Sequence, residues 1–285
     1  MQIFNFKLAL NNFLKQQKSK AKTIGFVPTM GALHQGHLSL IKRAKTENNL
    51  VVVSIFVNPT QFDNKKDLKK YPKSLNEDIR LLQEVKCDIL FVPSIAEIYS
   101  DKVRALSFDF DGLENIMEGR FRKNHFNGVA TIVKTLFEIV EPTTAYFGKK
   151  DFQQLQIIKK LVKKYSIPIL IKGGSIYREK DGLAMSSRNA QLTKEQRVAV
   201  PFIYKTLKEV KEKFKTQKIE ELTHWVEKQF SKHNTLNLEY FTIAEEESLQ
   251  NPKNIEVNKK YRAFIAVFAG DIRLIDNIGL CCACT

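Results

Sequence analysis

The segment IGFVPTMGALHQGHLSLIKR, residues 24–43, decides how this chain is interpreted. A short apolar run, residues 24–27, precedes a turn with Gly31 and then apolar residues at helical spacing, which predicts a strand, a turn and a helix. Glycine lets the backbone approach a ligand, and the first turn of a helix presents unpaired N–H groups and the positive end of its dipole. The segment therefore predicts a phosphate site at the helix start.

Two histidines lie inside this predicted site. His34 and His37 are three residues apart, so they share one face and point toward the anion if the helix has begun by His34. The glycine spacing also matches a nucleotide-hydrolase phosphate loop, but His37 and Leu38 stand where that loop requires Lys and then Ser or Thr. An isolated pair of this kind is more often a helix cap and a packing residue. The position after a strand and a glycine turn favours the phosphate site.

A second strand end also carries polar side chains. Residues 50–57 are a β-branched apolar run typical of a strand buried in a parallel sheet, and Asn58 and Gln61 follow it. Side chains just beyond such a strand line the ligand crevice of an open α/β sheet. Substrate contact and simple turn capping are equally good interpretations of these two residues taken alone.

The order of elements predicts the fold. After these two strands, a helix at 75–85, strands at 89–92, 144–147 and 167–171, and a helix at 152–165 follow. This alternation predicts a Rossmann-like, doubly wound parallel sheet over residues 1–174. Helices at 194–215 and 219–233, with strands at 238–244, 261–268 and 272–275, predict a smaller C-terminal α+β domain over residues 175–285. We expect this domain to act as a lid.

Further charged and hydroxyl residues follow the later strands. Lys150 and Asp151 follow the strand at 144–147, where a lysine can reach terminal phosphates, although a lysine pair is more often on the surface. The loop DGLAMSSRN, residues 181–189, offers many hydroxyl and cationic donors and suits a mobile lid over a triphosphate. Its serines could equally cap the next helix. Arg122 suits phosphate or carboxylate because its guanidinium is a planar fork.

Composition bounds the class of protein. The formal charge of +15 raises nucleic-acid binding as an alternative, but the lysines are scattered through helical segments as solvated faces, so we expect no nucleic-acid partner. No apolar run approaches the length of a membrane span, and polar residues interrupt the apolar N-terminal stretch, so we expect neither membrane insertion nor a signal peptide. Cys87, Cys281, Cys282 and Cys284 form no disulfide or zinc pattern, which fits a reducing cytoplasm.

Six blocks resemble one known family. The blocks PTMGALHQGH, FVNPTQF, the EGR…HFNG segment from Glu118, FGKKDFQQ, DGLAMSSRN and AGDIRLIDN are similar to the pantoate:β-alanine ligases, within the nucleotidyl-transfer superfamily. The resemblance covers nearly the whole chain. It implies that ATP, pantoate and β-alanine give pantothenate, AMP and diphosphate through a pantoyl adenylate. It also implies a homodimer.

The resemblance implies roles for individual residues. His34, His37 and Lys150 would be catalytic. The implied nucleotide contacts are Met30, His37, Gly148, Lys150, Asp151, Tyr177, Met185, Ser186, Ser187 and Arg188. The implied pantoate contacts are Thr29, Met30, Gln61, Arg122 and Gln154, with Glu118 and His125 beside them. Glu77 and Asp78 match positions near Mg²⁺, although both would also suit the first turn of a helix. Lys149 departs from the family, in which Glu is usual.

Two other functions remain open at this point. Another nucleotidyl transferase on the same fold would leave the pairing of Gln61 with Gln154 unexplained. An RNA-binding module would use the +15 charge and would show RNA affinity that falls steeply with salt. The chain has no aromatic-rich RNA motif to support it.

Overall fold

The computed structural model describes residues 1–63, 65–99 and 102–281. The chain divides into two compact units, of which the first is residues 1–149 and 153–175 and the second is residues 150–152 and 176–285. Cys282 and Cys284 lie outside the described residues. Within the described part of the chain, no helix is both long and apolar enough to cross a bilayer.

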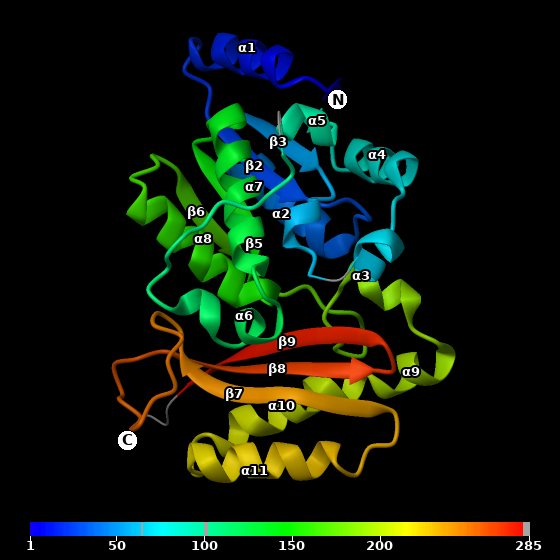
Figure 1. The fold of residues 1–285 in the computed structure, drawn as a ribbon, viewed down its shortest axis with the longest axis vertical. Helices are drawn as coiled ribbons and strands as arrows, with labels where there is room; N and C mark the ends of the chain where they lie inside the picture. The colour runs from blue at the N-terminus through cyan, green and yellow to red at the C-terminus, as the bar shows by residue number, and fades with distance from the viewer. Residues whose placement is uncertain (64, 100–101, 282–285) are drawn as a thin grey trace. The chain divides into compact units, whose positions relative to one another are not determined.

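The first unit is built on a six-stranded parallel sheet (Figure 1). Its order is β1-β4-β3-β2-β5-β6. The strands are β1 (Gln2–Phe4), β2 (Ile24–Thr29), β3 (Leu50–Ile55), β4 (Ile89–Phe91), β5 (Thr144–Gly148) and β6 (Leu170–Gly174). The predicted doubly wound fold with a smaller α+β domain is confirmed.

Helices cover both faces of this sheet. Leu38, Ile41 and Ala44 of α2 (Gln35–Glu47) share a buried core with Val27 of β2. The ring of Phe26, the preceding residue of β2, instead contacts Phe137 of α7 (His125–Val140), with ring centroids 6.4 Å apart. Successive strand residues point to opposite faces, so α2 and α7 lie on opposite sides of the sheet.

The remaining helical segments of the first unit are short or flank the sheet. They are α1 (Lys7–Lys18), η1 (Pro59–Gln61), α3 (Lys65–Lys70), α4 (Leu75–Glu84), α5 (Ile95–Ile98), η2 (Leu113–Asn115) and α6 (Glu118–Phe121). The η3 turn (Lys149–Asp151) and α8 (Phe152–Lys164) follow β5, and the division between the units falls within this stretch.

The second unit is a three-stranded antiparallel sheet with helices on one face (Figure 1). The strands are β7 (Leu236–Glu245), β8 (Tyr261–Ala269) and β9 (Ile272–Leu280), in that order. The helical segments are η4 (Ser187–Gln191), α9 (Lys194–Ala199), α10 (Pro201–Lys213) and α11 (Ile219–Phe230). Tyr261 and Ile265 of β8 share one buried core with Leu207 of α10 and Val226 of α11.

Several predicted element boundaries differ from the structure, and one strand was not predicted. The helix predicted at 194–215 is two helices, because Pro201 has no N–H to continue α9 and starts α10 instead. The strand predicted from residue 167 begins at Leu170, because Pro168 cannot donate to a ladder and the Ile169 N–H bonds back to the Ile167 carbonyl. The three-residue strand β1 was not predicted.

Candidate active site

The site of the first unit forms where the order of the parallel strands reverses. β2 and β5 are neighbours, the chain continues from β2 through β3 to β4 on one side, and it continues from β5 to β6 on the other. Ligands of open α/β sheets bind beyond the carboxyl ends of the strands at such a point. The glycine turn at residues 30–33 leaves the end of β2 at this position.

A buried carboxylate shapes that turn. Gly31 has φ +83° and Ala32 has φ +49°, a left-handed backbone that needs support at a non-glycine residue. Asp78, 1% exposed, accepts the N–H of Ala32 at 3.0 Å and the N–H of Leu33 at 2.7 Å. Thr29 Oγ1 donates to the Ser54 carbonyl at 2.8 Å. The turn before the histidines is therefore fixed through its main chain.

The two histidines lie side by side at the start of α2. His34 is the residue before the helix, and its ring centroid lies 4.0 Å from that of His37. His34 Nδ1 accepts the N–H of Gly36 at 3.2 Å, and His37 Nδ1 accepts the N–H of His34 at 3.3 Å. Because both Nδ1 atoms accept, each neutral ring carries its proton on Nε2. The helix start therefore combines two imidazole N–H donors with the positive dipole end.

Asn58 positions the side chain of Gln61 next to this turn. Asn58, 1% exposed, donates from Nδ2 to Gln61 Oε1 and to the Gly128 carbonyl, both at 3.1 Å. The Gln61 amide then directs its N–H toward Met30 Sδ at 3.2 Å. Residues predicted separately at the ends of β2 and β3 are thus brought together. Gly128 is required there, since a Cβ would lie 2.3 Å from the Thr60 carbonyl oxygen.

Tyr99 completes this polar group, and sequence reasoning missed it. Its hydroxyl donates to Asn58 Oδ1 at 2.6 Å, and it also lies 3.1 Å from Thr60 Oγ1. Burial raises the pKa of the Tyr99 phenol, and the hydrogen bond with Thr60 offsets only part of this rise. The hydroxyl therefore stays protonated and can donate. A tyrosine inside the segment IAEIYS carries no sequence signal for this role.

Arg122 and His125 support Gln61 from its main-chain side. His125 Nδ1 donates to the Gln61 carbonyl at 2.7 Å, and Arg122 Nη2 reaches the same oxygen at 3.4 Å. Arg122 Nη1 lies 3.2 Å from His125 Nε2, and Glu118 Oε2 lies 3.9 Å from Arg122. A carbonyl only accepts, so His125 carries its proton on Nδ1 and Arg122 donates to Nε2. The pantoate contact predicted for Arg122 stays a prediction.

The two glutamines at the start of α8 differ in environment. Gln153, 4% exposed, donates to the carbonyls of Leu113 and Ile116 at 2.8 and 2.7 Å and accepts the N–H of Glu118 at 3.0 Å. It therefore holds the segment before α7. Gln154 is half-buried, and its predicted contact with pantoate stays a prediction.

The pair predicted near Mg²⁺ has other partners in the structure. Both carboxylate oxygens of Asp78 already accept main-chain N–H groups. Glu77 is exposed and pairs with Arg80 at 2.6 Å, and the hydrogen bond from Arg80 lowers the pKa of the Glu77 carboxyl. Among the residues that the structure describes, no group of three or more His, Cys, Asp or Glu side chains is arranged to hold a metal ion. The predicted position of Glu77 and Asp78 near Mg²⁺, with contact through bound water, stays a prediction.

The remaining predicted residues, apart from Gly148 at the end of β5, belong to the second unit. Lys150 and Asp151 lie in the η3 turn, with Lys150 Nζ 3.8 Å from Asp151 Oδ1. The Met185 N–H donates to the Tyr177 carbonyl at 2.9 Å, which closes the loop immediately before Ser186, Ser187 and Arg188. Ser186 Oγ accepts the N–H of Arg188 at 3.3 Å, so this serine caps η4.

Comparison with known proteins identifies the family. The family model described as Pantoate-beta-alanine ligase matches residues 2–279. The chain belongs to this family. A pantothenate synthetase of Christiangramia forsetii is 52% identical over 281 residues, which cover 98% of this chain and 99% of the relative. One of Flavobacterium psychrophilum is 53% identical, over 98% of this chain and 100% of the relative.

Solved structures of the family share the fold. A pantothenate synthetase from Thermus thermophilus superimposes with a TM-score of 0.90 at 36% identity, over 98% of this chain and 99% of that one. A pantoate-beta-alanine ligase from Francisella tularensis, solved as a complex with beta-gamma ATP and beta-alanine, gives a TM-score of 0.81 at 37% identity. It covers 98% of this chain and 97% of that one. The predicted membership in the pantoate:β-alanine ligase family is therefore confirmed.

Proposed function

We infer that this protein joins pantoate to β-alanine in an ATP-dependent ligation. The observation that carries the mechanism is the histidine pair at the start of α2, held with both Nε2 atoms as donors beside the end of β2. This arrangement suits a phosphate that gains negative charge during attack. Family membership over residues 2–279 supports the substrates.

The first step that we propose is adenylation of pantoate. A carboxylate oxygen of pantoate attacks the α-phosphorus of ATP, the bond from that phosphorus to the bridging oxygen breaks, and diphosphate leaves with the electron pair. The carboxylate is already an anion, so no base is needed. Catalysis then consists of holding the reactants in line and stabilising charge on the phosphate oxygens. The Nε2–H groups of His34 and His37 would serve the α and β phosphates.

The second step that we propose forms the amide. The free amine of β-alanine attacks the acyl carbon of the adenylate, the bond to the AMP oxygen breaks, and AMP leaves. The amine loses a proton to solvent as the C–N bond forms. The product is pantothenate.

The amides near Met30 are proposed to bind pantoate. Gln61 is held by Asn58 in one orientation, which suits selection of a hydroxyl or carboxylate group. Gln154, Thr29 and Arg122 are proposed to complete this set. An amide fixed by a buried neighbour loses little conformational freedom on binding, which favours affinity.

Cationic and hydroxyl side chains are proposed as further phosphate donors. Lys150, Ser187 and Arg188 would bind the β and γ phosphates, because a lysine ammonium and a guanidinium fork are strong partners for phosphate. Gly148, Asp151, Tyr177, Met185 and Ser186 are proposed as further nucleotide contacts. The lid function predicted for residues 175–285 stays a prediction.

We propose that Mg²⁺ arrives with ATP as part of the substrate. Magnesium keeps several waters and binds phosphate oxygens, so it does not require a dedicated cage of side chains. Such a metal ion would neutralise charge on the diphosphate. We also propose that the protein is cytoplasmic. We propose further that it is a homodimer, and sedimentation at several protein concentrations would test this oligomeric state.

The experiment measures pantoate-dependent exchange of labelled diphosphate into ATP, with AMP formation followed with and without β-alanine. We expect His37→Ala to lower exchange by ~10²-fold, the scale for losing one preorganised donor. His224→Ala is the matched control, because His224 is 82% exposed in its side chain and lies on α11. Exchange at the wild-type rate in His37→Ala would refute the histidine assignment. Absence of exchange in the wild-type protein would refute the reaction.

A further inference from the structure

A buried asparagine of β9 holds the main chain of the lysine turn. Asn277 is 1% exposed, and its Nδ2 donates to the carbonyl oxygen of Lys150 at 2.8 Å. Its Oδ1 accepts from Arg262 Nη1 at 2.6 Å. A carbonyl can only accept and a guanidinium can only donate, so the Asn277 amide has a single satisfactory orientation. The sequence separation of 127 between Asn277 and Lys150 makes this a tertiary contact rather than a local turn.

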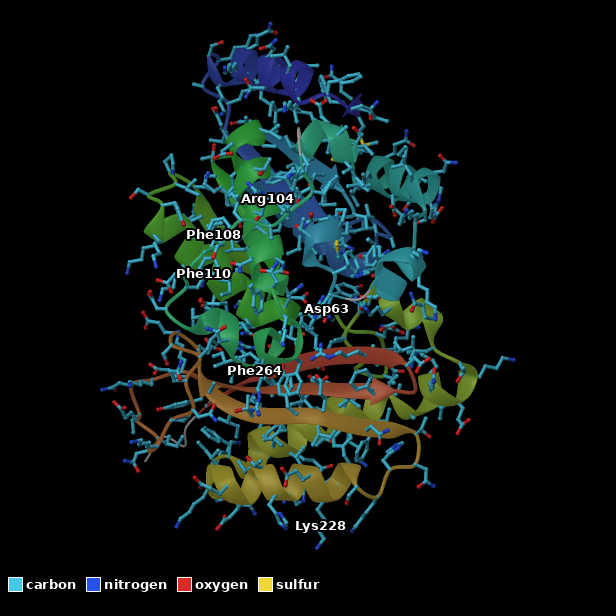
Figure 2. All side chains as sticks on the ribbon, in the orientation of Figure 1. Asp63, Arg104, Phe108, Phe110, Lys228 and Phe264 are labelled. Atoms are coloured by element: carbon cyan, nitrogen blue, oxygen red, sulfur yellow. The ribbon has the colours of Figure 1, made fainter. Side chains whose placement is uncertain are left out.

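An aromatic contact holds the same turn two residues further on. The Phe152 ring lies 5.9 Å from the ring of Phe264, which is labelled in Figure 2, and 4.2 Å from the Arg262 guanidinium carbon. Phe264 is the register partner of Asn277, and the two therefore share one face of the sheet. Residues 150–152 belong to the second unit, as do Phe264 and Asn277.

The residue before Asn277 makes a second buried contact, on the other face of the sheet. Asp276, 4% exposed, accepts two hydrogen bonds from Arg178, at 2.6 and 3.0 Å. The Arg178 guanidinium carbon lies 3.6 Å from the ring centroid of Tyr204, on α10. Burial raises the pKa of the Asp276 carboxyl, while the hydrogen bonds from Arg178 act in the opposite direction.

Arg178 in turn organises the loop that leads to the serines. It forms a β-bridge with Ala184, and its Nη1 donates to the Gly182 carbonyl at 3.0 Å. Gly182 has φ +96°, a left-handed conformation that suits glycine. The loop is therefore a short hairpin that runs directly into residues 186–188, and its base is fixed to β9 through Asp276.

We propose that Asp276 and Asn277 are positioning residues that fix Lys150 and the loop at residues 186–188 in one arrangement. Asn277 bonds the turn at Lys150 on one face of the edge strand β9. Asp276 binds Arg178, at the base of the loop before residues 186–188, on the other face. The proposal rests on the phosphate roles given above to Lys150 and to Arg188. Its physical basis is preorganisation: donors placed before the reaction need no reorganisation when charge develops on the leaving diphosphate.

The first test is Asn277→Ala, measured by diphosphate exchange. We expect the exchange rate at saturating ATP to fall by about 10-fold to 10²-fold, the scale for a misplacement of about 1 Å at a reacting group. Asn277→Asp keeps the volume and the acceptor for Arg262 but loses the donor to Lys150, so we expect a similar loss. If Asn277→Ala does not fold, the exchange rate of Asn277→Asp tests the proposal instead. Wild-type rates in the folded variants would overturn the proposal.

A double-mutant cycle separates positioning from general damage. If Asn277 acts through Lys150, then adding Asn277→Ala to Lys150→Ala changes exchange by less than about 2-fold. Independent effects that multiply would overturn the proposal even though each single variant is slow. Thr206→Val is the matched control, because Thr206 is also 1% exposed and its hydroxyl bonds the Phe202 carbonyl within α10. We expect exchange in that variant to stay within about 2-fold of the wild-type rate.

The second cycle tests the other half of the pair. Asp276→Asn keeps the volume but removes the charge that faces Arg178, and we expect exchange to fall by about 10-fold or more. The loss should shrink to less than about 2-fold in an Arg188→Ala background. Persistence of the full loss there would overturn the role of Asp276. These outcomes are distinct from failure of the proposed function, in which the wild-type protein itself shows no exchange.

Discussion

Replacement of Asp78 tests the geometry of the turn before the histidines. Its two oxygens accept the N–H groups of Ala32 and Leu33 at 3.0 and 2.7 Å in a site where Asp78 is 1% exposed. A hydrogen bond to a charged group contributes about 1.5–3 kcal/mol, so losing both predicts a cost of about 3–6 kcal/mol in Asp78→Ala. That is a large part of the free energy of unfolding of a typical domain, about 5–15 kcal/mol.

Asp78→Asn tests how much each of the two hydrogen bonds contributes to the free energy of unfolding. Asparagine keeps one acceptor oxygen but turns an NH₂ group toward the second main-chain N–H. We therefore expect a cost of at least about 1.5–3 kcal/mol, the value of one charge-assisted hydrogen bond. Urea denaturation followed by circular dichroism measures both variants. We also expect slower diphosphate exchange, because the turn leads directly to His34.

Glu77→Gln is the matched control, since Glu77 is a neighbour in the same helix turn but is exposed and paired only with Arg80 among the contacts described above. We expect an unchanged denaturation midpoint and an unchanged Mg²⁺ concentration for half-maximal exchange. Wild-type stability in Asp78→Ala would refute our account of this carboxylate. A raised Mg²⁺ requirement shared by the Glu77 and Asp78 variants would support the predicted position of both residues near Mg²⁺.

Two further predictions follow from displaced pKa values. Hydrogen bonds from Lys172 and two further side chains lower the pKa of Glu47 to about 2, so its ionised form stabilises the fold above the ordinary pKa of 4.5. Glu47→Gln should reduce stability at pH 7, and the gap in urea midpoint should narrow as pH falls below 4.5 toward 2; a gap independent of pH would contradict this. Burial raises the pKa of the Cys87 thiol to about 12. Peptide mapping after maleimide treatment at pH 7.5 should find Cys87 labelled only in denaturant, and rapid labelling of the native protein would contradict the burial.

The sequence predicted those parts of the molecule that depend on the chain's own local pattern. The run at residues 50–57 reads as a buried strand because β-branched residues occupy both faces, and β3 occupies most of it. The position of His34 and His37 at a helix start was predicted because a strand, a glycine turn and the first turn of a helix occur within 14 residues. β1 was not predicted because its three residues, QIF, are too short to show a strand pattern. It is a strand through its pairing with β4.

The supporting contacts of the site could not be predicted, for a common physical reason. Asp78, Gln153 and Asn277 each bind main-chain groups of a segment that is distant in sequence. Every non-proline residue carries the same N–H and C=O, so the identity of the partner residue gives no signal of such a contact. When two side chains bind each other, both residue types can signal the contact in the sequence. When a side chain binds main chain, only one residue type can.

This asymmetry also explains which polar residues the sequence assigned to metal or substrate. Carboxylates and amides near a strand end suit a ligand and suit a neighbouring loop equally well, because both supply the same donors and acceptors. Burial separates the two cases: Asp78 and Asn277 are both 1% exposed and already bonded to main chain, whereas His34 and His37 remain partly exposed with Nδ1 committed to the backbone. Residues of the first kind fix where the loops lie, and residues of the second kind are those that we propose as donors to the substrate. Substitution of the first kind should therefore alter stability and rate together. Substitution of the second kind should lower the rate, with a cost in the free energy of unfolding no larger than the about 0.5–2 kcal/mol of a lost helix cap.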